Sequence, residues 1–136
     1  MKARWAIYPV LLAAWPSAAW AEPVTGRWLT DAKDAVVLVD NCGQRMCGKI
    51  EQVLDPKLPT RDINNPDASL RSRPIIGTMV LRNFAGSGTN WKDGQAYDPK
   101  TGKSYKSKMR LLANGKLKVS GCILFLCEDR YWTRMP

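Results

Sequence analysis

The sequence contains no histidine among its 136 residues. Histidine is the commonest general base near neutral pH and a frequent metal ligand, so its absence excludes Ser-His and Cys-His catalysis. A metal site would need thiolates, usually at C-x2-C spacing or together with histidine, and this chain has neither arrangement. Acids such as Asp62, Asp93 and Glu128 show no spacing that catalysis requires. We therefore expect no cofactor, no metal and no enzyme activity.

The sequence also lacks an apolar run long enough to cross a membrane, which takes about 20 residues. Its longest run covers residues 5–15, follows two cations and is ended by a proline. This pattern, with Ala19-Trp20-Ala21 after it, predicts a signal peptide over residues 1–21 and not a membrane-spanning segment. We expect a periplasmic or secreted protein whose mature part, residues 22–136, forms a single domain.

Acidic residues are scarce beside basic ones, at 12 against 21, which gives a net charge of +9. Without residues 1–21, which hold two of the cations, the charge is +7. Because an exported protein meets no chromosome, we expect no nucleic-acid partner. Seven of the cations follow one another with no acid between them. They form either a solvated face or a docking patch for an anionic envelope polymer or a membrane surface. They are Lys100, Lys103, Lys106, Lys108, Arg110, Lys116 and Lys118.

Cysteine occurs only four times, as Cys42-x4-Cys47 and Cys122-x4-Cys127. An even number of cysteines in an oxidising compartment indicates disulfides. Each spacing fits a hairpin, so we predict that Cys42 pairs with Cys47 and Cys122 with Cys127. Both bridges close short loops and should point outward.

Apolar residues recur with a period of two, and turn residues interrupt them at short intervals, which predicts an all-β antiparallel meander. Residues 55–74 contain four prolines and form the one long connection, because proline is excluded from central strands. We expect about eight strands, near residues 24–30, 35–41, 47–54, 75–83, 90–97, 104–112, 116–123 and 127–134.

Turn residues also predict which side chains face the interior. A three-residue turn ending at Gly115 places Leu111 opposite Leu117, Met109 opposite Val119 and Ser107 opposite Gly121. A similar turn ending at Gly102 places Tyr97 opposite Tyr105, Gln95 opposite Ser107 and Trp91 opposite Leu111. The two cysteine hairpins then give a last set of neighbours, namely Leu117 with Trp132, Val119 with Arg130, Gly121 with Glu128, Asp40 with Lys49 and Val39 with Ile50.

Gly26-Arg27-Trp28 near the start of the mature chain and Trp132-Thr133-Arg134 near its end resemble the lipocalin signature, in which a late arginine packs over the first tryptophan. More specific motifs lie between them. In order they are Met46-Cys47-Gly48-Lys49-Ile50, Asp62-Ile63-Asn64-Asn65-Pro66, Arg73-Pro74-Ile75-Ile76-Gly77, Trp91-Lys92-Asp93-Gly94-Gln95-Ala96-Tyr97-Asp98-Pro99 and Gly102-Lys103-Ser104-Tyr105. Together they resemble the bacterial domain of unknown function 2147 family.

The resemblance implies a secreted or periplasmic bacterial protein with an eight-stranded lipocalin-like barrel, and it implies no particular reaction. Eight strands leave room for side chains or one small ligand. In such a barrel Trp28, Trp132 and Arg134 would close the base, and the long loop would lie at the open rim. The candidate ligand-binding residues are Arg130, Glu128, Tyr97, Tyr105, Gln95, Ser107, Asp62, Asn64 and Asn65.

Each candidate also has a structural interpretation. Asp62, Asn64 and Asn65 either hold the loop through hydrogen bonds to its backbone or contact ligand. Arg130 and Glu128 form either an ion pair at the barrel mouth or an anchor for the polar or anionic head of a ligand. Our leading hypothesis is a noncatalytic protein that binds a small apolar or amphiphilic ligand in the barrel. The alternative is an envelope or surface interaction protein that uses its basic outer face.

Overall fold

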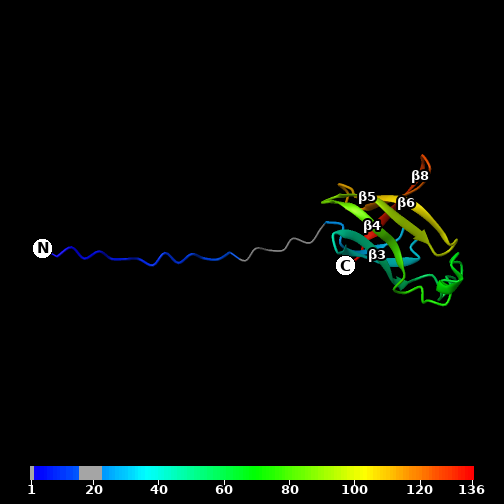
Figure 1. The fold of residues 1–136 in the computed structure, drawn as a ribbon, viewed down its shortest axis with the longest axis horizontal. Coiled ribbons are helices and arrows are strands. Elements are labelled where there is room, and N and C mark those ends of the chain that lie inside the picture. The colour runs from blue at the N-terminus through cyan, green and yellow to red at the C-terminus, as the bar shows by residue number, and fades with distance from the viewer. Residues whose placement is uncertain (1, 16–22) are drawn as a thin grey trace.

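The structure is a computed structural model that describes residues 2–15 and 23–136. Residues 2–15 form no helix or strand and extend away from the folded part (Figure 1). The expected cleavage site after Ala21 lies outside the described residues, so the signal peptide stays a prediction. Within the described part of the chain, no helix has the length and apolar character needed to cross a membrane.

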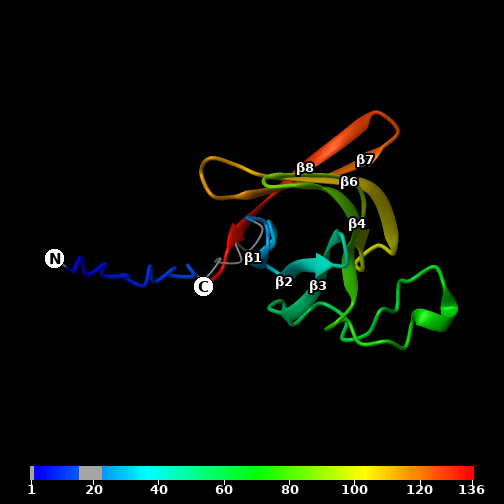
Figure 2. The same ribbon diagram turned by 60° about the vertical axis from the view of Figure 1, so that its left-hand side comes forward.

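Eight antiparallel strands close into a barrel in sequence order, and the last strand pairs with the first (Figures 1 and 2). The prediction of an all-β, eight-stranded meander is confirmed. One short 3-10 helix, η1, lies in the long connection. The elements are β1 Gly26–Leu29, β2 Ala35–Cys42, β3 Arg45–Val53, η1 Ala68–Leu70, β4 Met79–Ser87, β5 Asn90–Asp98, β6 Lys103–Leu111, β7 Leu117–Ile123 and β8 Leu126–Arg134.

The long connection extends further than the prolines indicate, because β4 begins at Met79, four residues later than expected. The backbone just before β4 instead forms hydrogen bonds within the loop and with β3. The N–H of Ile75 donates to the carbonyl of Thr60 at 3.0 Å, and the N–H of Gly77 donates to that of Ile50 at 2.7 Å. These bonds hold the end of the loop beside the barrel before pairing between β3 and β4 begins.

The interior is filled at one end by large apolar side chains from alternate strand positions. Burying a side chain of this size stabilises the fold by about 1.5–3 kcal/mol. The largest side chains that are fully buried are Trp28, Phe84, Met46, Leu81, Met109 and Leu117.

The base of the barrel is closed by Arg134, whose guanidinium lies 4.3 Å from the centre of the Trp28 ring. Arg134 also donates hydrogen bonds to the carbonyls of Thr25 and Pro23. A Cβ on Gly26 would lie 2.8 Å from the same guanidinium, so the G-x-W spacing leaves room for the arginine. The expected cation–π closure is therefore present.

The register of the last three strands agrees with the sequence prediction. Leu111 pairs with Leu117, Met109 with Val119 and Ser107 with Gly121. On the other side of β7, the pairs are Leu117 with Trp132, Val119 with Arg130 and Gly121 with Glu128. Both predicted disulfides, Cys42–Cys47 and Cys122–Cys127, are formed.

The predicted register between β5 and β6 is wrong by one residue near the turn and by two residues beyond an irregularity between Trp91 and Gly94. Tyr105 pairs with Ala96 instead of Tyr97, Ser107 with Gly94 instead of Gln95, and Trp91 with Met109 instead of Leu111. Four residues, not three, separate the closing pair of Asp98 and Lys103. The Asp98 carbonyl accepts from the N–H of Gly102 at 2.8 Å and the Asp98 side chain from that of Lys100 at 2.9 Å, so aspartate stabilises the longer turn.

The pairing predicted around the first disulfide is also wrong, here by two residues. Asp40 pairs with Cys47, not Lys49, and Val39 pairs with Gly48, not Ile50. The hairpin closes at Cys42 and Arg45, with only two residues between them. The disulfide therefore joins cysteines that are not directly opposite each other, although the predicted bond itself is present.

Candidate functional site

A cavity of about 340 Å³ opens at the end of the barrel opposite the Arg134 closure. This volume lies at the lower end of the range for small-molecule sites, about 300–1,000 Å³. Its inner wall is apolar, and the wall beside the long loop adds Leu58, Pro59 and Ile75. The side chains that make the apolar wall include Val37, Ile50, Val80, Leu81, Ala96, Val119 and Trp132.

Gly121 and Tyr105 lie next to each other in the wall of this cavity. A Cβ on Gly121 would be 3.5 Å from the Cβ of Tyr105, which is ordinary van der Waals contact. Any larger side chain at Gly121 would extend into the open space. Gly121 therefore contributes to the cavity by having no side chain, as its inward position in the sequence suggests.

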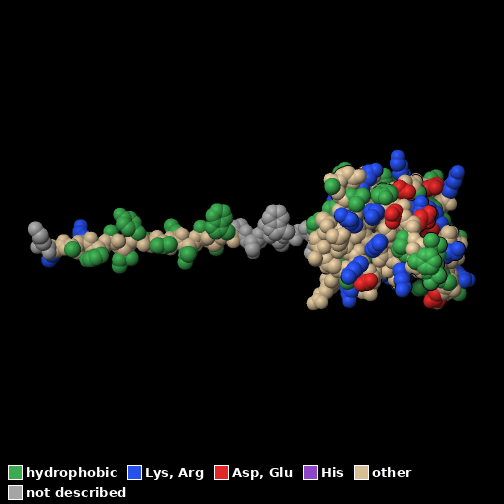
Figure 3. All heavy atoms as spheres, turned by 90° about the horizontal axis from the view of Figure 1, so that it is seen from above, with side chains coloured by type: hydrophobic (Ala, Val, Ile, Leu, Met, Phe, Trp, Pro, Cys, Tyr) green, Lys and Arg blue, Asp and Glu red, His purple; other side chains and the backbone are tan. Residues whose placement is uncertain are grey.

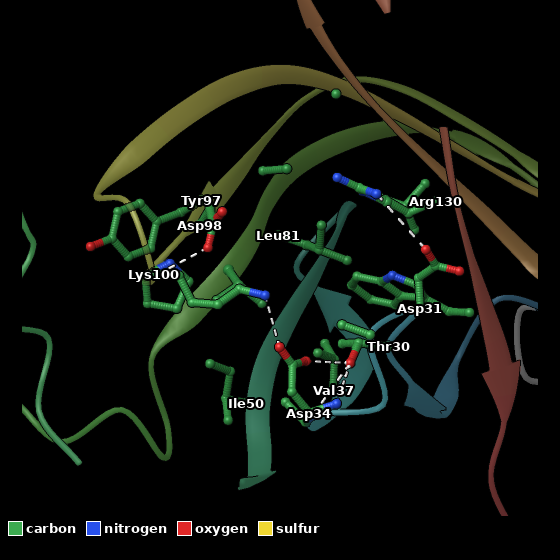
Figure 4. A pocket seen from close by; sticks show the side chains of 18 of the residues that line it. Thr30, Asp31, Asp34, Val37, Ile50, Leu81, Tyr97, Asp98, Lys100 and Arg130 are labelled. Carbon is green, nitrogen blue, oxygen red and sulfur yellow. Dashed lines mark hydrogen bonds and ion pairs between the residues drawn. The ribbon is translucent and has the colours of Figure 1, made fainter. Parts of the chain in front are cut away.

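One side of the mouth is held by Asp34 and Lys100, which connect the β1–β2 and β5–β6 loops (Figure 4). The Lys100 ammonium lies 2.8 Å from the Asp34 carboxylate, and the Thr30 hydroxyl donates to the same carboxylate at 2.6 Å. Burial alone would raise the pKa of Asp34, but these two hydrogen bonds and the charge of Lys100 outweigh burial and lower it. The same hydrogen bond raises the pKa of Lys100 although burial opposes this. The pair is thus charged across the neutral range.

Arg130 lies at the other side of the mouth, between two acids. Its guanidinium is 3.9 Å from the carboxylate of Asp31 and 3.4 Å from that of Glu128. The side chains of Arg130 and Glu128 are 56% and 77% exposed, so this is an ion pair largely in solvent. Both residues line the cavity, as the β7–β8 register predicts.

The two tyrosines that the sequence places directly opposite each other are offset by one residue in the structure. Both tyrosines line the cavity, but the Tyr97 hydroxyl points away from the mouth and toward the long loop (Figure 4). Gln95 is exposed and does not line the main cavity. Gln95 and Tyr97 both line a second hollow of about 170 Å³ beneath the long loop. The one-residue shift between β5 and β6 is the cause for Gln95, because it turns this side chain away from the interior.

Asp62 is fully buried within the long loop and accepts hydrogen bonds from three side chains. The Tyr97 hydroxyl donates at 2.5 Å, and the Asn65 amide and the Arg73 guanidinium each donate at 2.9 Å. Burial would raise the pKa of Asp62, but these hydrogen bonds lower it. Burial and the bond to Asp62 raise the pKa of Tyr97 to about 12. Asn65 and Arg73 tie the loop to itself, whereas Tyr97 on β5 fixes it against the barrel.

Asn64 fastens the same loop to the turn between β5 and β6. Its side-chain amide donates to the carbonyls of Pro99 and Lys100 at 3.2 and 3.1 Å. A Cβ on Gly102 would lie 1.9 Å from the Asn64 carbonyl oxygen, and Gly102 has a φ of +73°. Glycine is therefore required where the two loops meet. Neither Asp62, Asn64 nor Asn65 lines the main cavity.

Ser107 is buried on the inward side of β6, but the main cavity does not reach it. It pairs with Gly94 on one side and Gly121 on the other. Within the described part of the chain its hydroxyl has no hydrogen-bond partner. Burying such a hydroxyl costs free energy. The surroundings of Ser107 therefore do not explain why a serine occupies this position.

The charged residues at the mouth were only partly identifiable from sequence. Asp31 and Asp34 lie in the loop between β1 and β2, and Lys100 belongs to the basic run. The opposite charges on these two loops were the sequence signal for an ion pair at the mouth. Which of them pair depends on the closure of the barrel. In the described residues, no group of three or more acids and cysteines could hold a metal ion.

The family described as "Uncharacterized protein conserved in bacteria (DUF2147)" matches residues 26–134, from the first strand to the last. The chain belongs to the DUF2147 family. Among curated proteins no match is found. The DUF2147 barrel is also similar to a solved structure titled "Protein HP1028 from the human pathogen Helicobacter pylori belongs to the lipocalin family".

The superposition with the Helicobacter pylori protein has a TM-score of 0.75 and covers 86% of this chain and 85% of the other. Sequence identity is 20%, so the likeness establishes the fold of this DUF2147 chain and nothing about its ligand. The lipocalin-like architecture agrees with the barrel, the base closure and the cavity described above. The two disulfides and the bacterial family fit a location outside the cytoplasm.

Proposed function

We propose that this DUF2147 protein is a noncatalytic carrier or sensor that holds one small, mainly apolar ligand inside its barrel. The observation that carries the proposal is the cavity of about 340 Å³, which has an apolar wall and a charged mouth. A few polar groups at the entrance of an apolar cleft orient a ligand, while the wall supplies most of the binding free energy. The base is sealed by Arg134 over Trp28, so the ligand enters at the mouth.

The charges at the mouth specify the head of this ligand. Four acids and two cations line it, and each cation lies close to an acid. Lys100 forms an ion pair with Asp34, and Arg130 lies between Asp31 and Glu128. The sequence suggested an anionic head beside Arg130. Because acids are in excess, the mouth should instead favour an apolar molecule with a cationic amine head. The four acids are Asp31, Asp34, Asp98 and Glu128.

The arrangement of the acids supports a role without catalysis. Asp62 is used within the long loop, and Glu128 is paired with Arg130. Asp93 is exposed in an irregular part of β5, with a φ of 58°. The three side chains are therefore not gathered around one reacting position. We further propose that the protein works in the periplasm or after secretion, for which the two disulfides and the sequence of residues 1–21 are the support.

Competition against a neutral fluorescent dye would test the proposal. Three alkyl compounds of equal chain length, bearing an amine, an alcohol or a carboxylate, would be titrated at pH 7 below their micelle concentrations. We expect all three to displace the dye and the amine to bind tightest, by about tenfold over the carboxylate, which corresponds to about 1.4 kcal/mol. Equal affinity for the amine and the carboxylate would refute the proposed head group.

Gly121→Leu provides the matching loss of function, because its side chain would fill the cavity beside Tyr105. Ala113→Leu adds a similar side chain on an exposed turn and serves as the control. Dye binding should disappear in the first variant and persist in the second. Binding that survives Gly121→Leu would place the ligand outside the barrel, as the interaction-protein alternative requires.

A further inference from the structure

The hairpin formed by β7 and β8 ends in four consecutive apolar residues that face solvent. Their exposed fractions are 60% for Ile123, 87% for Leu124, 88% for Phe125 and 72% for Leu126. The hairpin projects beyond the rest of the barrel (Figure 2). The view from above in Figure 3 shows hydrophobic side chains on this face of the molecule, with Lys and Arg as well as Asp and Glu side chains spread around them. We call residues 123–126 the apolar tip.

The barrel does not need apolar residues at this tip. β1 pairs with β8 only at Thr133 and Arg134, so the outer part of β8 is bonded to β7 alone. Leu124 also has a φ of 56°, a conformation that glycine or asparagine would adopt with less strain. A polar turn would therefore suit the fold better than this one, which indicates that the apolar tip serves an interaction.

The tip is held in place by the disulfide between Cys122 and Cys127, which joins the two strands directly beneath it. A staple at this position limits how far the two strands can separate. The tip therefore approaches a partner already ordered, which reduces the conformational entropy lost on binding.

Basic side chains lie beside the tip on the outer face of the barrel. Lys106 pairs with Cys122 directly beneath the tip, and Lys108 and Arg110 follow on the same exposed face of β6 at increasing distance from the tip. Two acids lie nearby on β8, but Glu128 is close to Arg130 and Asp129 accepts a hydrogen bond from Ser120 at 2.5 Å. An apolar tip next to basic side chains thus suits a partner with an apolar interior and an anionic surface.

We propose that the apolar tip inserts into the interfacial layer of an anionic membrane and that the neighbouring lysines bind lipid phosphates. A projecting tip of four large side chains needs no matching groove, because a fluid lipid layer closes around it. Glu128 and Arg130 lie on the same hairpin and line the cavity mouth. Docking by the tip therefore brings the opening close to the lipid surface. This proposal does not depend on the cavity holding a ligand.

Fluorine NMR offers a direct test, because the chain contains only two phenylalanines. Phe125 is at the tip and Phe84 is completely buried in the core, so 4-fluorophenylalanine gives one reporter and one internal control. The full-length protein would be mixed with bicelles of phosphatidylcholine and phosphatidylglycerol. We expect a nitroxide attached below the lipid headgroups to broaden the Phe125 signal much more than the Phe84 signal. We also expect the lipid to shield Phe125 from a soluble gadolinium chelate.

The same experiment separates the tip from the apolar residues 5–15, which could bind lipid by themselves. If the protein associates with bicelles while Phe125 stays accessible to gadolinium, the chain is anchored elsewhere and the proposal is wrong. It is equally wrong if Phe125 is shielded without lipid and the protein sediments as a dimer, since the tip then binds a second copy.

Two double variants test the energetics in vesicle flotation. Leu124→Asn with Phe125→Ser removes the tip but keeps a turn that tolerates positive φ. Ile63→Ser with Ile76→Ser removes two apolar side chains of 56% and 59% exposure from the long loop and is the matched control. We expect the first pair to lower partitioning into anionic vesicles about tenfold, or about 1.4 kcal/mol, and the second pair to leave it unchanged. Equal partitioning of the two variants would overturn the proposal.

Discussion

Two arginines of β8 lie four positions apart on the inward side of the strand and do different things. Arg134 covers Trp28 and caps two backbone carbonyls at the base of the barrel, whereas Arg130 is half exposed at the mouth. A contact that joins both ends of the chain contributes to folding. A solvated ion pair contributes little to it.

We therefore expect Arg134→Ala to lower the free energy of unfolding by about 1–3 kcal/mol, from the lost cation–π contact and the unpaired carbonyls. Arg130→Ala should change it by less than about 0.5 kcal/mol while altering ligand selectivity at the mouth. Urea denaturation of both variants measures the difference. Equal destabilisation by the two substitutions would contradict the roles given to them.

Ser107 allows a second prediction about a single residue. Its buried hydroxyl is unpaired within the described part of the chain, so replacing it by a methyl group removes a desolvation cost without losing a hydrogen bond. Ser107→Ala should leave the melting temperature unchanged or raise it, by up to about 1 kcal/mol in unfolding free energy. A clear loss of stability, measured by calorimetry, would show that the hydroxyl has a partner such as a buried water or ligand.

Among the structural elements, the long loop is ordered chiefly by the side chains around Asp62. The carboxylate accepts from Tyr97, Asn65 and Arg73, and the pKa of Asp62 is lowered as a result. A lowered pKa in the folded state means that the stabilisation is present above the unfolded pKa, near 4. It is lost as the pH falls through the lower folded value.

Asp62→Asn should consequently destabilise the protein by about 2 kcal/mol at pH 7, and this difference from the wild type should shrink below about pH 4. Urea titrations at several pH values, with Asp93→Asn on β5 as the exposed control, would measure it. The same difference at pH 3 and pH 7 would mean that the charge of Asp62 does not hold the loop.

The strand registers show what could be predicted from sequence and what could not. Gly115 and two rows of matched apolar residues fixed the pairing of β6, β7 and β8, because a slip by one residue would have turned every one of them outward. The pairing of β5 with β6 depends on hydrogen bonds made by Asp98 within its turn. The sequence pattern contains no signal for that choice, so Gln95 was placed inside although it is exposed.

The same limit applies to the site. The inward direction of Arg130, Glu128 and Gly121 follows from the hairpin and was predictable. The pairing of Lys100 with Asp34 joins loops 66 residues apart, so it depends on how the barrel closes. Of the two interpretations offered for Asp62 and Asn65, the structure shows the hydrogen bonds that hold the loop.

At the scale of the whole molecule, the net charge of +9 and the acidic mouth have opposite signs. The outside of β6 and β7 should attract anionic polymers or lipids, while the cavity favours a cationic head. Because exposed charges are screened over about 8 Å at physiological ionic strength, salt should weaken the first interaction strongly.

Heparin chromatography tests the outer face. Replacing Lys106, Lys108 and Lys118 by Glu should lower the salt concentration needed for elution more than replacing Lys33, Lys49 and Lys57 by Glu. Both sets make the same change in net charge, so a difference reports the position of the charges. Identical elution of the two variants would mean that net charge alone governs retention.

The central claim is that the barrel holds a small molecule, and native mass spectrometry of protein purified from its own bacterial host tests it most directly. We predict a peak heavier than the polypeptide by the mass of one bound organic molecule carrying a basic nitrogen. This peak should be absent from the Gly121→Leu variant, whose cavity is filled, and present in Ala113→Leu. A wild-type protein that shows only its own mass, or a bound molecule that persists in Gly121→Leu, would contradict the account.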